Sequence, residues 1–156
     1  MTQVEDPISL LGKSSDSPEI QDMLRQAGAK DPKLKKGDVR AWVDLNDLGL
    51  ALVFADEAFF TREENLAIGE GALILTSITI HSGDDPDFAA FAGVLPLGVE
   101  FSQSQRDLLA RLGKPEWSNS FLLKDRWLVD GTRFLVQYAD DLDRILTFSI
   151  QVPDPQ

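Results

Sequence analysis

Leu50-Ala51-Leu52-Val53-Phe54-Ala55-Asp56 is matched 84 residues later by Phe134-Leu135-Val136-Gln137-Tyr138-Ala139-Asp140. Both runs are apolar, end in an aromatic residue followed by Ala-Asp, and have the length of a β-strand. Around them, Ser17–Gly28 lies over Ser102–Gly113 at an offset of 85, which also places Trp42 on Trp127. Ile74–Ile78 meets Ile145–Ser149 at an offset of 71. This stepped register predicts an internal duplication, with extra residues in the first copy after Asp56.

Each copy predicts one helix followed by three strands. Ser17 and Pro18 suit the start of the first helix, and the second is expected from Ser102 to Gly113. Because turns rather than crossover helices separate the strands, the sheet should be antiparallel. The expected fold is therefore α+β: two tandem helix-plus-antiparallel-β-meander units, with the helices packed on one face of the sheet. We expect a single domain over 1–156, with repeats at about 14–81 and 99–152 joined by a loop at 82–98.

The three tryptophans are expected to have different roles, two in core packing and one as a candidate for partner binding. As equivalents in the two copies, Trp42 and Trp127 are expected to be core residues at the interface between helix and sheet. Trp117 has no counterpart in the first copy, where Pro32 stands. It follows the second helix in a predicted loop, and is therefore a candidate for an exposed interface residue, although packing remains the alternative.

Charge and composition exclude several classes of function. The 156 residues carry a formal net charge of −11, which disfavours nucleic acid binding. There is no cysteine, hence no disulfide or thiol catalysis. No apolar run has the length of a membrane helix, and the first residues have no signal-peptide pattern, so we expect a cytoplasmic protein that binds no membrane. Acidity for solubility alone remains an alternative.

The side chains give little support for catalysis. His81 is the only histidine, and it is expected at the edge of a loop. The acidic residues lack the spacing of a calcium loop, and the Gly69-Glu70-Gly71 segment precedes rather than follows a strand. We therefore expect no catalytic residues, no bound metal and no cofactor.

Three groups of acidic residues outside the helices are candidates for partner binding. Each is dense enough to present several charges together, and the alternative is that each is a solvated turn. The groups are Glu63 and Glu64 in the extra segment, Asp84, Asp85 and Asp87 between the copies, and Asp140, Asp141 and Asp143 in the last hairpin.

Several short motifs carry a resemblance to known families. Leu97–Ser104 followed by Leu112-Gly113-Lys114-Pro115 resembles the helix motif of β-lactamase-inhibitor-like and small outer-membrane assembly lipoprotein domains. The same stretch, with Leu10-Leu11-Gly12-Lys13, Ser17-Pro18-Glu19 and Leu95-Pro96-Leu97-Gly98, resembles immunity proteins of bacterial polymorphic and type VI secretion toxins. The lipoprotein and secreted inhibitor families need a signal, and the lipoproteins a lipobox cysteine, so the immunity proteins are the better match.

The resemblance implies a function of stoichiometric inhibition. An immunity protein neutralises a cognate antibacterial toxin by binding and occluding it. For a cytoplasmic immunity protein, the toxin is expected to act in the cytoplasm, as a nuclease with a basic substrate groove that an acidic protein can fill. The alternative is a non-toxin adaptor or chaperone-like protein-binding module.

Overall fold

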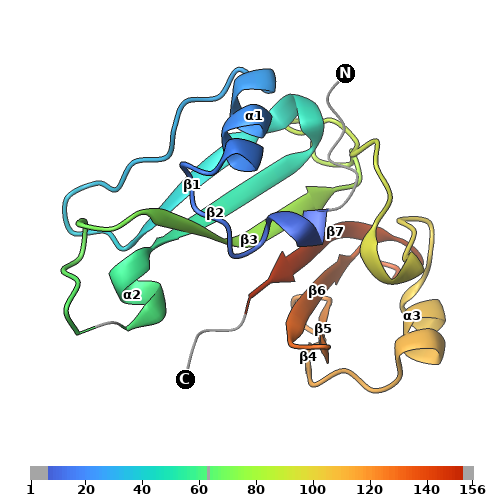
Figure 1. Cartoon of the computed structure of the whole chain (residues 1–156). Coiled ribbons are helices and arrows are strands. Elements are labelled where there is room, and N and C mark those ends of the chain that lie inside the picture. The colour runs from blue at the N-terminus through green and yellow to red at the C-terminus, as the bar shows by residue number, and fades with distance from the viewer. Residues whose placement is uncertain (1–6, 63, 153–156) are drawn as a thin grey trace.

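Turn signals and short apolar runs divide most of the chain into strands of a single antiparallel sheet. The computed structural model describes residues 7–62 and 64–152. Seven strands lie in the order β1-β2-β3-β7-β6-β5-β4, and every pairing is antiparallel (Figure 1). The strands are β1 (Arg40–Leu45), β2 (Leu50–Asp56), β3 (Leu73–His81), β4 (Trp117–Asn119), β5 (Lys124–Val129), β6 (Thr132–Tyr138) and β7 (Ile145–Gln151).

The helices of the described residues are short. They are α1 (Pro18–Gln26), α2 (Glu57–Thr61) and α3 (Gln105–Leu112), with single 3₁₀ turns at Pro7–Leu10, Asn46–Leu48 and Pro96–Gly98. None of these helices is both long and apolar enough to cross a bilayer. The second helix begins later than predicted because Ser104, not Ser102, caps it: Ser104 and Asp107 form a reciprocal capping box.

One face of the sheet holds the hydrophobic core. Most buried apolar side chains of β2, β3, β6 and β7 lie at alternate positions, interrupted at bulges, as expected for a sheet with one covered face. Side chains from α1, α3 and the segments before and between them complete the core. Its members include Leu10, Ile20, Leu24, Leu52, Phe54, Ile78, Ile80, Leu95, Val99, Leu108, Phe134, Val136, Phe148 and Ile150.

The predicted fold class is wrong. The chain is dominated by one continuous seven-stranded sheet, and the helices have only nine, five and eight residues. They are too short to form the predicted helical layer of two tandem helix-plus-meander units, and loop residues such as Leu95 and Val99 help to cover the core. The structure also contains β4 and α2, which the predicted unit lacks.

The predicted equivalence of Trp42 and Trp127 is also wrong. Trp42 lies opposite Val53 on the face of the sheet away from the core, with 66% of its surface exposed. Trp127 lies opposite Phe134 on the core face, is 3% exposed, and donates its indole N–H to the Gly113 carbonyl at 3.0 Å. The division into repeats at about 14–81 and 99–152 stays a prediction.

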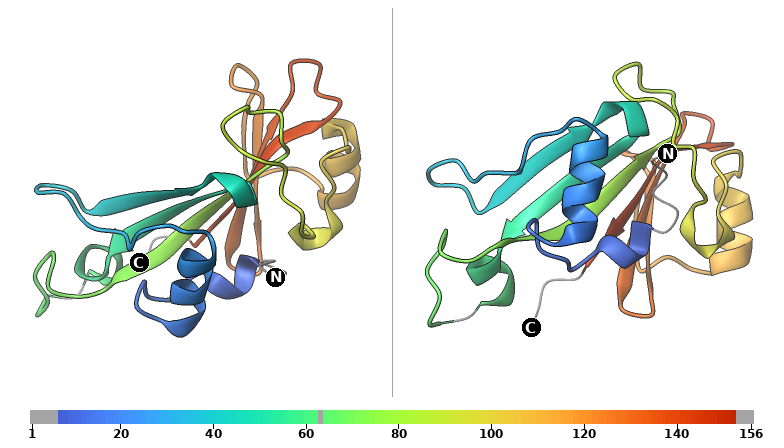
Figure 2. Two further views of the ribbon diagram at one scale, coloured as in Figure 1. Left: turned by 90° about the horizontal axis from the view of Figure 1, so that it is seen from above. Right: turned by 45° about the horizontal axis from the view of Figure 1, so that its top comes forward.

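The sheet is strongly twisted. In the left view of Figure 2, β1–β3 run across the picture whereas β5–β7 run nearly upright. α1 and α3 both lie on the outer side of the resulting bend. The opposite side, which we call the open face, is the concave side of the bend in the backbone.

Candidate functional site

The open face carries two rows of side chains that run across the strands. The register places Trp42, Val53, Ser77, Gln151, Arg133 and Leu128 side by side in the first row. The second row runs across all seven strands through Asp44, Ala51, Thr79, Ser149, Leu135, Arg126 and Trp117. The central members of both rows are small or polar, and three of the four ends, Trp42, Leu128 and Trp117, are large and apolar.

Two of the three tryptophans lie at opposite edges of the open face. Trp42 is on edge strand β1, and Trp117 is on edge strand β4 with 36% of its surface exposed. The Arg126 guanidinium lies over the Trp117 ring, with its carbon 5.4 Å from the ring centroid. Trp117 is thus partly exposed, as its candidate role at an interface requires, and it lies on a strand rather than in the predicted loop. Its contact with a partner stays a prediction.

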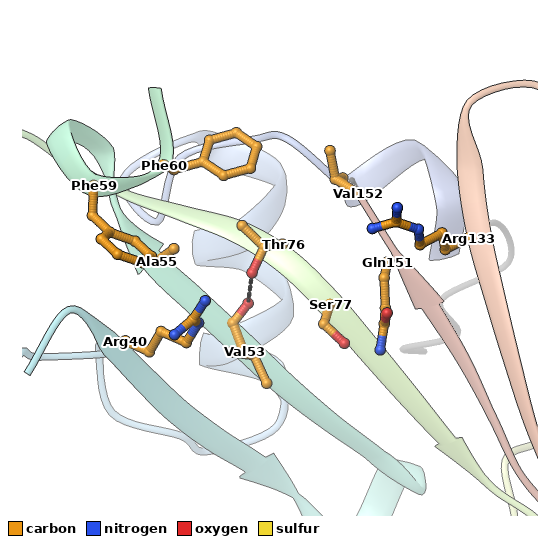
Figure 3. Close-up of a pocket in the computed structure, with 10 residues that line it drawn as sticks. All are labelled: Arg40, Val53, Ala55, Phe59, Phe60, Thr76, Ser77, Arg133, Gln151 and Val152. Atoms are coloured by element: carbon orange, nitrogen blue, oxygen red, sulfur yellow. Dashed lines mark hydrogen bonds between the residues drawn. The ribbon is translucent and has the colours of Figure 1, made fainter. Parts of the chain in front are cut away.

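A buried aspartate places two phenylalanines beside the open face. Asp56 is fully buried, and its two carboxylate oxygens accept the backbone N–H groups of Phe59 at 3.2 Å and Gly69 at 2.8 Å. The first bond caps α2 and the second holds the loop that returns to β3, so Asp56 anchors the chain on both sides of this loop. As a result, α2 directs Phe59 and Phe60 toward the open face (Figure 3).

A pocket of about 310 Å³ lies between α2 and the first row. Its floor comes from β2, β3 and β7, and Arg40 and Arg133 stand on opposite sides of it (Figure 3). The Arg40 guanidinium carbon lies 4.9 Å from the centroid of the Phe59 ring. Arg133 Nε lies 3.4 Å from a carboxylate oxygen of Glu116, which also accepts from Arg126 Nε at 2.8 Å.

Two of the three predicted acidic groups meet at one end of the sheet. Arg144 forms an ion pair with Asp84, and the Ser82 backbone N–H donates to the Leu146 carbonyl at 3.1 Å. The Asn46 side chain donates to the Asp87 carbonyl at 2.8 Å, which adds the β1–β2 turn to this cluster. We call the resulting surface the acidic rim; its members are Asp47, Asp84, Asp85, Asp87, Asp140, Asp141 and Asp143.

Some carboxylates of the acidic rim also shape its turns. Asp85 accepts the backbone N–H of Asp87 at 2.9 Å, and Asp141 accepts that of Asp143 at 3.3 Å. Hydrogen bonding from Asp143 lowers the pKa of Asp141 below its ordinary value, and the same contact raises the pKa of Asp143. Asp85 and Asp141 therefore act as turn residues, as in the alternative of solvated turns, and the side chains of the acidic rim remain on the surface.

The third acidic group is not part of the rim. Glu64 is exposed between α2 and β3, at the opposite end of the sheet. Glu63 lies outside the described residues. Beside the rim, the turn between β4 and β5 exposes Phe121 almost completely, at 92%.

Sequence reasoning missed Trp42, Arg40 and Arg133. The sequence did contain a signal for Trp42. Arg40, Trp42 and Asp44 occupy alternate positions of β1 and so share one face, whereas Ala41 and Leu45 lie on the other face. In a strand with one covered face, Trp42 must then point to the same side as the two charged residues. No comparable signal placed Arg40 near Arg133, since their proximity depends on the order of the strands and the twist of the sheet.

A second buried carboxylate has a structural role. Asp125, which is buried, accepts hydrogen bonds from Gln105 at 3.0 Å, Ser118 at 2.6 Å and Tyr138 at 3.0 Å. Burial, with Asp125 beside it, raises the pKa of Tyr138. These bonds tie α3, β4 and β6 to β5. Among the described residues, no group of three or more acidic or histidine side chains is placed to hold a metal.

His81 lies under the loop that follows β3. It is 8% exposed and stacks on Phe88, with ring centroids 3.8 Å apart and an angle of 3° between the rings. Within the described part of the chain, its Nδ1 has no hydrogen-bond partner. Burial lowers the pKa of His81 below 6.5, although Asp85 and Asp44 act in the opposite direction.

We expect His81 to make the fold sensitive to mild acid. Below about pH 6.5 the unfolded chain binds a proton at this histidine more readily than the folded one, so stability falls as pH falls. Between about pH 7.5 and 5.5, the free energy of unfolding should drop more in the wild type than in His81→Phe. Urea unfolding at both pH values measures this difference. Equal drops would show that His81 titrates alike in both states.

Comparisons with known proteins concern the fold alone. No family model matches the chain, and no curated protein matches it. Among solved structures, it is similar to a cysteine-rich secretory protein from Staphylococcus aureus, with a TM-score of 0.56 and 12% sequence identity. The match covers 96% of this chain and 47% of that one, so this chain spans about half of that protein's length. This chain contains no cysteine.

Proposed function

We propose that this protein inhibits a cognate toxin by binding it stoichiometrically through the open face. The observation that carries this proposal is the pair of exposed tryptophans at opposite edges of that face, with Arg126 and Arg133 between them. Tryptophan and arginine are the residue types most enriched among those that dominate binding energy at protein interfaces. Exposed tryptophan is also costly in water, which favours a surface that a partner covers.

The size of the open face suits such a complex. Seven strands have six spaces of about 4.8 Å between them, which gives a width of about 29 Å. The seven residues of β2 extend over about 23 Å. Together these dimensions are comparable with the roughly 800 Å² that each partner contributes to a standard interface.

The negative charge of the acidic rim favours a partner with a basic surface. Its aspartates concentrate negative charge at one end of a chain whose formal net charge is −11. Such a charge distribution accelerates encounter with a positively charged protein and repels nucleic acid. Together with the motifs that resemble immunity proteins, it favours a nuclease toxin that acts in the cytoplasm, where this protein would then reside.

Co-expression tests this proposal. A partner captured from the native bacterium should be toxic when produced alone in a host cell, and cells should survive only when this protein is made in comparable amounts. The measurement is growth against the ratio of the two proteins, with purified complex analysed for stoichiometry. Protection at a small fraction of the toxin's amount would contradict inhibition by binding. A captured partner without toxicity would instead indicate an adaptor.

A further inference from the structure

The pocket between α2 and the first row has a charge opposite to that of the chain. The charged residues among those that line it are Arg40 and Arg133, both cationic, within a protein of formal net charge −11. Such a local reversal of sign attracts an anionic group to this place and not to the acidic rim.

Each guanidinium group has one neighbour beside the pocket, and within the described residues the buried Nε of Arg133 has no hydrogen-bond partner. Glu116 lies on the Nε side of Arg133, so the terminal nitrogens of that side chain extend over the pocket (Figure 3). The Phe59 ring supports the Arg40 guanidinium by a cation–π contact, and within the described residues Arg40 forms no ion pair. A ligand therefore meets two cations whose positions Glu116 and Phe59 restrict only in part.

The remaining lining matches a carboxylate with an apolar neighbour. Ser77 and Gln151 offer neutral hydrogen-bond donors on the floor, and Phe59 and Phe60 form an apolar wall. A planar guanidinium matches the two oxygens of a carboxylate, so a single carboxylate group can form two hydrogen bonds with one arginine here. A polyanion such as nucleic acid would be repelled by the rest of the surface.

We propose that this pocket binds the carboxylate side chain of an acidic residue in a peptide segment of a partner protein, with an adjacent apolar residue against Phe59 and Phe60. The source of the peptide rests on the proposed function, whereas its chemistry rests on the pocket alone. Arg133 would pair with the carboxylate, Gln151 would donate to it from the floor, and Arg40 on the opposite side of the pocket would add attraction at longer range.

Titration with short peptides tests the pocket without the partner. The probe is a blocked pentapeptide with glutamate between two leucines, and its control has glutamine in place of the glutamate. Protein NMR should show shifts of the backbone amides of Ser77 and Gln151 and of the Arg133 side chain. The glutamine peptide should bind at least about tenfold more weakly, since it lacks the charge that pairs with guanidinium.

Protein variants locate the binding. Arg133→Gln should lower the affinity for the glutamate peptide by about tenfold, and Arg40→Gln should lower it by less. Arg106→Gln, an equal change of charge on the surface of α3, should leave it unaltered. The proposal is overturned if both peptides bind alike or not at all at millimolar concentration, if the shifts lie in the acidic rim, or if inorganic phosphate binds more tightly than the glutamate peptide. These outcomes leave inhibition of a toxin through the open face untouched, so the two proposals can fail separately.

Discussion

Replacement of both Trp42 and Trp117 by alanine is expected to weaken binding of the partner by at least about a hundredfold. Truncation of a tryptophan that dominates an interface commonly costs about 2 kcal/mol or more of binding free energy. A tenfold loss of affinity corresponds to about 1.4 kcal/mol. Both side chains are exposed on the open face, so the fold should survive their removal. Calorimetric titration with the captured partner measures the loss, and thermal unfolding checks that the variant is folded.

Leu109→Ala is the matched control for this loss. Leu109 is an exposed apolar residue of α3, on the side of the sheet away from the open face. Its removal should change the affinity less than threefold. If Leu109→Ala weakened the complex as much as the double tryptophan variant, the partner would bind the helical side instead.

Phe148→Ala is expected to lower the free energy of unfolding by about 3–5 kcal/mol. Phe148 is fully buried in β7, lies opposite Ile80 and Val136, and packs against the Phe134 ring with centroids 5.7 Å apart. Its removal leaves a cavity where β3, β6 and β7 meet, and the total stability of a domain is only about 5–15 kcal/mol. Urea unfolding followed by circular dichroism measures the change.

Phe121→Ala makes the same chemical change at an exposed site. The Phe121 side chain is almost wholly in water, so its removal should cost less than about 0.5 kcal/mol. Similar losses for the two variants would mean that β7 does not lie in the core of the sheet.

The sequence predicts the strands better than the helices. The apolar runs at 50–56, 74–78, 134–140 and 145–149 fall largely within β2, β3, β6 and β7, because burial of one face and turn chemistry both act within a few residues. The expected helical layer is absent because α1 and α3 are short. The repeat pattern also gave no sign of α2, which Asp56 caps, or of β4, which pairs with β5. The capping box that starts α3 at Gln105 was readable from Ser104 and Asp107, but Ser102 offered a competing cap.

The candidate site depends more on tertiary structure. Alternation of residues in β1 identifies the exposed side of Trp42, whereas the apparent match with Trp127 pointed to the core. Arg40 and Arg133 are far apart in the sequence and come together only because β3 pairs with β7. For the same reason the last two acidic groups meet in one rim, while Glu64 lies at the other end of the sheet.

Fluorine NMR of the 5-fluorotryptophan-labelled protein in complex with its unlabelled partner tests the role of the open face most directly. The chain contains three tryptophans, of which Trp42 and Trp117 lie on the open face and Trp127 lies in the core. We predict that the resonances of Trp42 and Trp117 shift and lose contact with solvent on binding, while that of Trp127 stays unchanged. A complex in which Trp42 and Trp117 keep their free resonances would contradict binding through the open face.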